Sequence, residues 1–177
     1  MKTSIRNLSR RILIIDDQNS IHEVFRTVLL HPSLDNGALN DLESELFGVT
    51  APICNDDASK PSVSHIVEFA HQGEEGYQKL HTALQRGEHF DVAFVDMQMP
   101  PGWNGLETIR QLWTLAPSLP IVVCTAYSEY SWIDICKRLG NTEQLNLLPK
   151  PFVSHEVLNF VNNVVNSCQL SGRDLVF

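Results

Sequence analysis

The feature that most constrains the fold is a series of five short apolar runs, separated by segments whose apolar residues recur at helical spacing. The runs cover residues 12–15, 65–70, 92–95, 121–124 and 145–148. Short aliphatic runs are typical of strands covered on both faces, and strands that alternate with helices favour a parallel sheet. The second run partly alternates between apolar and polar residues, which indicates a place nearer the edge. The pattern predicts a doubly wound, five-stranded α/β domain.

The segments after the runs predict the helices of this domain. Apolar residues recur at intervals of three and four over 21–29, 77–84 and 106–116, and the pattern is weaker over about 129–139. Gly140 is expected to end this weaker helix and Ser154 to cap a last one. The fifth strand is expected to stop at Pro149.

Residues 31–63 interrupt the alternation. This stretch is rich in proline and acidic residues, and a connection of that length is unusual inside a compact domain. We therefore predict an insertion between the first helix and the second strand, with a short helix over 40–48. The expected organisation is an amino-terminal extension at 1–10, one domain over 11–168, and a tail or linker at 169–177.

Composition excludes several classes of protein. The net charge of -8 and the absence of a Lys/Arg cluster beyond the first eleven residues argue against direct binding of nucleic acid. The four cysteines show neither a C-x-x-C pair nor a zinc spacing, so reduced thiols in the cytoplasm are expected. No apolar run is long enough for a membrane helix, and no signal peptide is visible.

Chemistry concentrates where the predicted strands end. Ligands of open α/β sheets bind at the carboxyl ends of the strands. The residues that follow four of the five runs are Asp16 and Asp17, Asp96, Thr125, and Lys150. Each alone is usually a turn or solvated residue, but three carboxylates at one edge would repel each other without a cation between them. Carboxylate oxygens suit Mg²⁺, and a lysine ammonium suits a phosphoryl oxygen.

Four motifs resemble the receiver domain of two-component response regulators. They are R-I-L-I-I-D-D-Q at 11–18, V-D-M-Q-M-P-P-G-W-N-G at 95–105, C-T-A at 124–126 and P-K-P-F at 149–152. They stand in the family's order and at fitting intervals, and the resemblance covers about 11–31 and 64–168. It implies a flavodoxin-like sheet with strand order 2-1-3-4-5.

The resemblance also implies a role for each site residue. Asp96 would accept a phosphoryl group from a histidine kinase. Asp17 and Asp96 would bind Mg²⁺ directly, together with the backbone carbonyl of Gln98, and Asp16 would act mainly through bound water. Lys150 would pair with the phosphoryl group, its bond to Pro151 being cis. Thr125 would donate its hydroxyl to the phosphoryl group and move the loop that follows.

The departures from the family concern the residues that would change conformation when Asp96 is phosphorylated. The position three before the lysine, commonly aromatic, is Leu147, so Tyr127 and its aromatic neighbours are candidates for a substitute, with simple packing as the equal alternative. In the family, the residues at the positions of Gln98 and Tyr127 tune dephosphorylation, and the resemblance implies that a bulky Tyr127 favours slow loss of the phosphoryl group. The loop after Asp96 carries an added proline and tryptophan. Trp103 is expected to cover the edge of the site, with binding of a partner by this loop as the less favoured alternative.

Two other functions stay open. A phosphatase of the haloacid-dehalogenase type also uses an aspartate at a strand end and Mg²⁺. That class requires a second aspartate at the position of Gln98, which this chain lacks. An interaction scaffold that is never phosphorylated is the other alternative, whereas a flavin carrier is disfavoured because the first turn lacks a phosphate loop.

We expect a signalling domain rather than an enzyme. Its partners would be a sensor histidine kinase or phosphotransfer protein, an output domain beyond Phe177, or a second copy bound through the face of the fourth helix, fifth strand and fifth helix.

Overall fold

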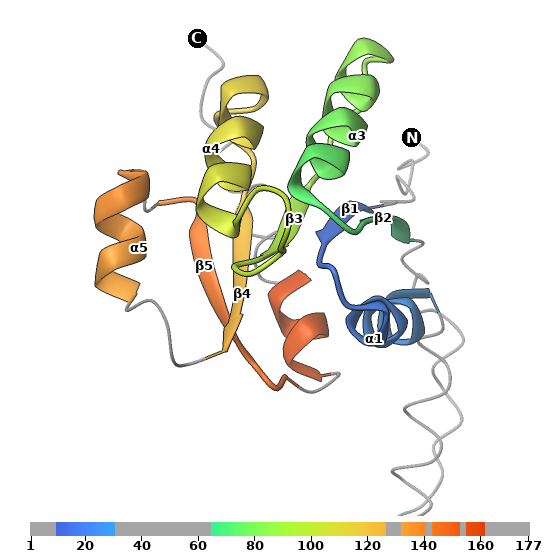
Figure 1. Cartoon of the computed structure of the whole chain (residues 1–177). Coiled ribbons are helices and arrows are strands. Elements are labelled where there is room, and N and C mark those ends of the chain that lie inside the picture. Colours follow the sequence, from blue (N-terminus) through green and yellow to red (C-terminus); the bar gives the residue numbers. More distant parts are fainter. Residues whose placement is uncertain (1–9, 31–64, 127–131, 141–142, 153–154, 162–177) are drawn as a thin grey trace, which may run out of the picture.

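The computed structural model describes residues 10–30, 65–126, 132–140, 143–152 and 155–161. Its centre is a five-stranded parallel sheet in the order β2-β1-β3-β4-β5 (Figure 1). The strands are β1 (Arg10–Ile15), β2 (His65–Ala70), β3 (Val92–Asp96), β4 (Ile121–Ala126) and β5 (Leu145–Lys150). The predicted fold class and strand order are confirmed.

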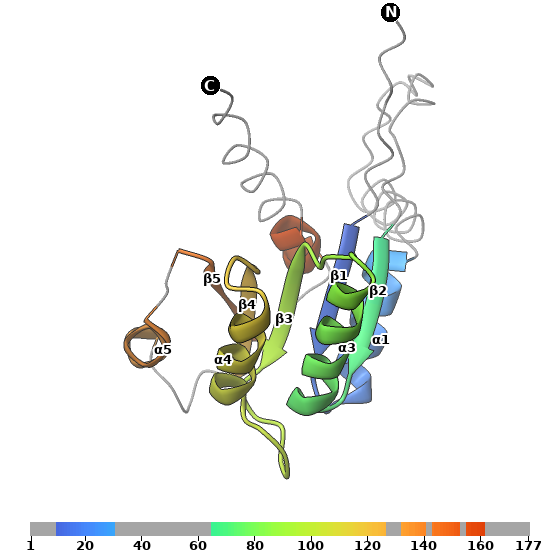
Figure 2. The same cartoon turned by 90° about the horizontal axis from the view of Figure 1, so that it is seen from above.

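Helices cover both faces of the sheet. They are α1 (Asn19–Leu30), α3 (Gly73–Gln85), α4 (Gly105–Leu115) and α5 (Trp132–Leu139), and residues 155–161 are also helical. Figure 2 shows α1 and the helical residues 155–161 on one side of the sheet and α3, α4 and α5 on the other. The sheet is therefore doubly wound, as parallel sheets with helical crossovers are.

Two apolar clusters hold these layers together. On the side of α1, Phe25 packs its ring against Phe94 of β3 at 4.8 Å between centroids, and Val157 and Val161 join the same cluster. On the other side, Leu80 of α3 and residues of α4 and α5 meet the alternate residues of the same strands. Because neighbouring residues of β1 and β3 face opposite clusters, the central strands are apolar throughout, which explains their uninterrupted runs in the sequence.

The edge strands behave differently from the central ones. Ile66 of β2 is 43% exposed, and this strand lies at an edge as predicted from its partial alternation. The expectation that the fifth strand stops at Pro149 was wrong. Thr125 pairs with Pro149 and Ala126 with Lys150, so both strands continue to the site. A proline is compatible with β5 because this strand is also an edge, where a missing N–H leaves no gap in the ladder.

Helix ends follow the capping chemistry of the sequence. The side chain of Asn104 accepts a hydrogen bond from the Glu107 amide at 3.0 Å and so caps α4. Gly140 has a φ of +73° directly after α5, which confirms it as the C-terminal stop. The 31–63 insertion, its expected helix, Tyr127 and Ser154 all lie outside the described residues. No helix within the described part is long and apolar enough to span a membrane.

Candidate functional site

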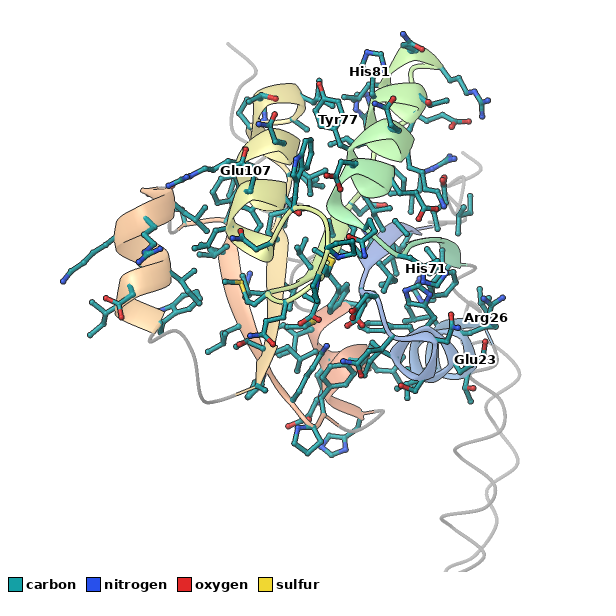
Figure 3. The ribbon with its side chains drawn as sticks, viewed as in Figure 1. Glu23, Arg26, His71, Tyr77, His81 and Glu107 are labelled. Carbon is teal, nitrogen blue, oxygen red and sulfur yellow. The ribbon has the colours of Figure 1, made fainter. Side chains whose placement is uncertain are left out.

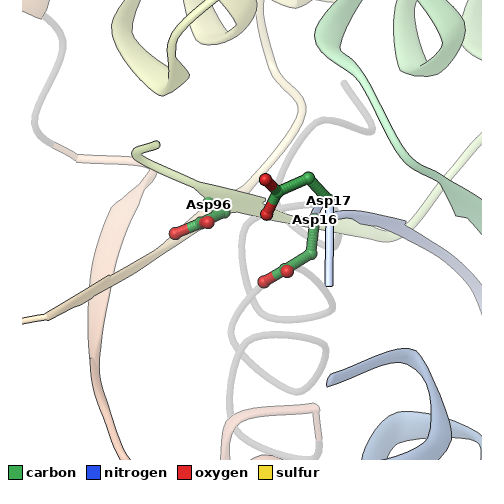
Figure 4. Close-up of side chains that lie close together, drawn as sticks. All are labelled: Asp16, Asp17 and Asp96. Carbon is green, nitrogen blue, oxygen red and sulfur yellow. The ribbon is translucent and has the colours of Figure 1, made fainter. Parts of the chain in front are cut away.

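Three carboxylates meet where β1 and β3 end. Asp96 is the last residue of β3, and Asp16 and Asp17 follow β1 directly. One carboxylate oxygen from each lies within 4.8 Å of one from each of the other two. Figure 4 shows the three side chains together at this edge. The adjacency arises because β1 and β3 are hydrogen-bonded neighbours, with Ile15 paired to Val95, so the residues after both strands emerge at the same level.

Lys150 supplies the positive charge at the same place. Its Nζ lies 2.7 Å from Oδ2 of Asp16 and 3.1 Å from Oδ1 of Asp96. The three side chains are only 14%, 3% and 6% exposed, so water screens these pairs weakly. The residue comes from β5, which is not adjacent to either of the strands that carry the acids.

Backbone hydrogen bonds fix the two buried acids. Oδ1 of Asp16 accepts from the Gln18 amide at 2.9 Å, an Asx turn that leads into α1, while the Asp16 amide donates to the carbonyl of Ala70 at 3.0 Å. Oδ1 of Asp96 accepts from the Met97 amide at 2.8 Å. Both carboxylates are therefore oriented before any ligand arrives.

The remaining predicted residues line an open pocket beside the acids. This pocket has a volume of about 240 Å³. Its walls are formed by Asp17, Gln18, Asp96, Met97, Gln98, Pro100, Thr125, Ala126 and Lys150. Thr125 is 7% exposed, and its hydroxyl donates to the carbonyl of Ala126 at 3.1 Å. Of the nine lining residues, five are those that the sequence assigned to the site, and Asp16 lies behind them against Lys150.

The electrostatics of the pocket reflect crowded charges in a buried place. Burial raises the pKa of Asp96, and the Asp16 carboxylate adds to this, although Lys150 opposes it. Burial lowers the pKa of Lys150, but its contacts with Asp16 and Asp96 outweigh that effect and raise it overall. The ammonium therefore stays charged, whereas an ionised Asp96 is held at a cost that another cation would reduce.

The donor set fits a hard divalent cation. Oδ1 of Asp17 is buried and has no hydrogen-bond partner among the described residues. An orphaned carboxylate oxygen is costly, and a cation that takes one oxygen each from two or three carboxylates would satisfy it. Asp16 is differently placed, because one oxygen binds Lys150 and the other accepts from the Gln18 amide. Asp16 therefore has both oxygens engaged, whereas Asp17 offers an unpaired oxygen that could hold a cation.

The other expectations for residues around the site have mixed outcomes. Trp103 does not line the pocket: its ring lies edge-on to Tyr77 of α3 at 6.0 Å between centroids, and Figure 3 shows Tyr77 on the side of α3 that faces α4. Leu147 is half-buried against the cluster beneath α3, α4 and α5. The bond between Lys150 and Pro151 is cis, as expected, and so is that between Pro100 and Pro101.

A buried imidazole also lies near the acids. His22 of α1 is 3% exposed, with its ring 4.5 Å from that of His71 between centroids. Burial lowers the pKa of His22, and His71 lowers it further, against the opposing effect of Asp16. The packing of His22 agrees with a structural role.

Comparison with known proteins identifies the family. The sequence model of the response regulator receiver domain matches residues 60–162. Sporulation initiation phosphotransferase F of Bacillus subtilis is 29% identical over 94 residues, which is 49% of this chain and 73% of that protein. The osmosensing histidine protein kinase SLN1 of Saccharomyces cerevisiae is 32% identical over 74 residues, 42% of this chain and only 6% of that kinase.

Solved structures show the same fold. A CheY-like response regulator receiver domain protein from Methanospirillum hungatei superimposes with a TM-score of 0.62 at 19% identity, covering 93% of this chain and 100% of that one. Chemotaxis protein CheY4 of Vibrio cholerae gives 0.59 at 21% identity, covering 89% and 99%. The family match does not reach Asp16 and Asp17, but the sheet places β1, which leads into both, beside β3 of the matched part. With the acids, the lysine and the sheet order in agreement, the chain belongs to the response regulator receiver domain family.

Proposed function

We propose that Asp96 of this receiver domain is the phosphoryl acceptor and that the acid pocket is built for that single transfer. The observation that carries the proposal is the convergence of three carboxylates within 4.8 Å beside an ammonium that contacts two of them. A purely structural cluster would not leave a buried oxygen of Asp17, a residue that lines the pocket, without a partner among the described residues.

The donor of the phosphoryl group in the proposed transfer is a phosphohistidine. A carboxylate oxygen of Asp96 attacks the phosphorus, an O–P bond forms, and the P–N bond to the donor imidazole breaks. The imidazole leaves with the electron pair and takes up a proton. Lys150 lies 3.1 Å from Oδ1 of Asp96 and is placed to neutralise charge on the transferred group, and the Thr125 hydroxyl lines the same pocket.

Asp17 and Asp96, with the backbone carbonyl of Gln98, are the residues that would hold Mg²⁺, and Asp16 would reach it through water. When bound, this cation would offset the negative charge that gathers as a phosphoryl group approaches three carboxylates. The raised pKa of Asp96, caused by burial and by Asp16, is the reason that such an offset matters here.

The phosphoryl donor and the readout that we propose follow those of the family. We assign the donor as a sensor histidine kinase or a phosphotransfer protein in the cytoplasm, with a domain over 11–168 flanked by an extension at 1–10 and a tail at 169–177. The readout would be an output domain beyond Phe177 or a partner bound at the face of α5, β5 and the last helix. Thr125 is the first residue that would respond to phosphorylation of Asp96, and Tyr127 and Leu147 are the further candidates for this conformational switch. Self-phosphorylation and slow self-dephosphorylation would be its only catalysis.

The test is phosphorylation by acetyl phosphate with and without Mg²⁺. The wild-type chain and the Glu23→Gln variant, whose exposed side chain lies on α1 away from the pocket, should both take up one phosphoryl group when Mg²⁺ is present. Asp96→Asn should take up none, measured as the mass increase of the intact protein. Equal labelling of Asp96→Asn would refute the assignment, and sustained turnover of p-nitrophenyl phosphate would favour the phosphatase instead.

A further inference from the structure

We infer that Gly105 is a positioning residue for phosphoryl transfer, because its missing side chain lets the start of α4 close on the strand end that carries Asp96. The inference rests on the proposed function of Asp96. Gly105 is the first residue of α4 and is buried, and its amide donates to the carbonyl of Met97 at 3.0 Å. The start of α4 is thus bonded to the residue next to the acceptor.

The space at Gly105 is limited first by backbone atoms and then by the sulfur of Met97, which a Cβ would approach to 2.9 Å. A Cβ there would lie 2.5 Å from the carbonyl oxygen of Asp96 and 2.7 Å from Cα of Met97. A Cβ at Gly76 would instead meet the side-chain carbons of Ile15, and one at Gly102 the ends of Gln72 and Glu74. Among the described glycines, Gly105 is therefore the one whose crowding would fall directly on backbone, which cannot rotate away as a side chain can.

The same contact sets the geometry of the pocket. Residues 97–104 form a loop whose two ends are joined by the hydrogen bond from Gly105 to Met97, and this loop supplies Gln98 and Pro100 to the pocket wall. The Met97 amide donates both to the carbonyl of Cys124 at 3.1 Å and to Oδ1 of Asp96 at 2.8 Å. Any displacement of Met97 is therefore passed to the Asp96 carboxylate through one hydrogen bond.

Steric space, not conformation, makes glycine necessary here. Among the described glycines only Gly87 and Gly140 have positive φ, so the backbone at Gly105 is one that alanine adopts freely. An alanine should also favour the helix itself, since glycine is the poorer helix former. The expected effect of Gly105→Ala is thus a displaced acceptor in a chain that still folds.

The experiment compares Gly105→Ala with Gly76→Ala, the same substitution at a buried helical glycine that presses only on a side chain. Two quantities are measured with Mg²⁺: the rate of phosphorylation by acetyl phosphate and the chemical shift of the Met97 amide. Gly105→Ala should react about 10- to 100-fold more slowly than wild type, because sub-ångström misplacement of a reacting group is costly, and the Met97 amide should shift. Gly76→Ala should keep a rate near that of wild type at a comparable melting temperature.

A Gly105→Ala rate within about threefold of wild type with an unmoved Met97 amide would overturn the inference, and so would equal slowing in both variants. If Gly105→Ala does not fold, Asn104→Ala decides the question, because it frees the start of α4 by removing its cap without adding bulk. A slower reaction with a shifted Met97 amide supports the inference, and a wild-type rate overturns it. Failure of the proposed function would appear separately, as a wild-type chain that takes no phosphoryl group or an Asp96→Asn chain that takes one.

Discussion

The contact between Lys150 and the two buried acids offers a quantitative test of the site. Lys150→Met keeps an unbranched apolar side chain that is one atom shorter, and it removes the ammonium that contacts both acids. With an effective dielectric constant of about 20, the separations of 2.7 and 3.1 Å correspond to gross attractions of about 6 and 5 kcal/mol. Desolvation of the ammonium and of both carboxylates opposes these attractions, so the measured loss should be smaller. Removing one partner of a buried pair typically costs about 3–5 kcal/mol.

The assay is thermal unfolding of wild type and Lys150→Met, with EDTA and then with saturating Mg²⁺. A chain of this size loses about 2–4 °C for each kcal/mol, so a loss of about 3 kcal/mol lowers the melting temperature by about 6–12 °C in EDTA. The carboxylates then lack any counter-charge, and Mg²⁺ should restore a large part of the loss. The half-saturating Mg²⁺ concentration should fall as well, because Asp16 no longer pairs with an ammonium and the cluster carries one more net negative charge.

The control is Lys79→Met, which removes a hydrogen bond to the carbonyl of Phe69 and breaks a pair with Glu75 at 2.8 Å between side chains that are 32% and 41% exposed. Such a pair contributes less than about 1 kcal/mol, and its loss should not depend on Mg²⁺. Equal melting temperatures for Lys150→Met and wild type in EDTA would refute the electrostatic reasoning. A loss that Mg²⁺ leaves unchanged would show that Lys150 and the cation do not act on the same acids.

Two further predictions concern the acids themselves. Burial raises the pKa of Asp96, so the ionised carboxylate lowers the stability of the fold at any pH above that pKa. This cost vanishes as the pH falls below the ordinary value of 3.8, because the carboxyl is then protonated in both the folded and the unfolded chain. Asp96→Asn should therefore have a higher melting temperature than wild type at pH 7 in EDTA, and the difference should fade towards pH 3.5. A variant that melts lower at pH 7 would mean that the Lys150 contact outweighs burial. Mg²⁺ at ten times its dissociation constant should stabilise wild type by about 1.4 kcal/mol, or about 3–6 °C. Asp17→Ala should lose most of that gain, and an undiminished gain would remove Asp17 from the cation site.

The gathering of the site residues was predictable because the carboxyl ends of parallel strands all lie at the same end of the sheet. Once the five apolar runs were taken as strands, the acids, the threonine and the lysine after them had to lie at one end of the sheet, whatever the details of packing. Sequence also indicated that β2 is an edge strand, since its alternation differs from the unbroken runs of β1 and β3. These inferences need only the period of the side chains.

Features that depend on tertiary distance could not be predicted. The closeness of Gly105 to the Asp96 carbonyl is a property of how α4 meets β3, and a glycine after an asparagine at a helix start has no such meaning by itself. The extension of β5 through Pro149 was missed because a proline normally ends a strand, and only the edge position of β5 makes it acceptable. Trp103 was expected to cover the edge of the site because it follows Asp96 closely in the sequence, whereas its ring packs against Tyr77.

The topology explains why Lys150 can serve both acids at once. With β3 and β4 between β5 and β1, the strands that carry Lys150 and lead to Asp16 are separated by about 14 Å, at roughly 4.8 Å for each neighbour. In register, Asp96 pairs with Cys124 and Cys124 with Leu148, so Lys150 stands two residues beyond the level of Asp96. Its side chain therefore crosses the end of β4, where Thr125 and Ala126 are small enough to leave it room. A change of charge at Asp96 would therefore reach β5 directly through the side chain of Lys150.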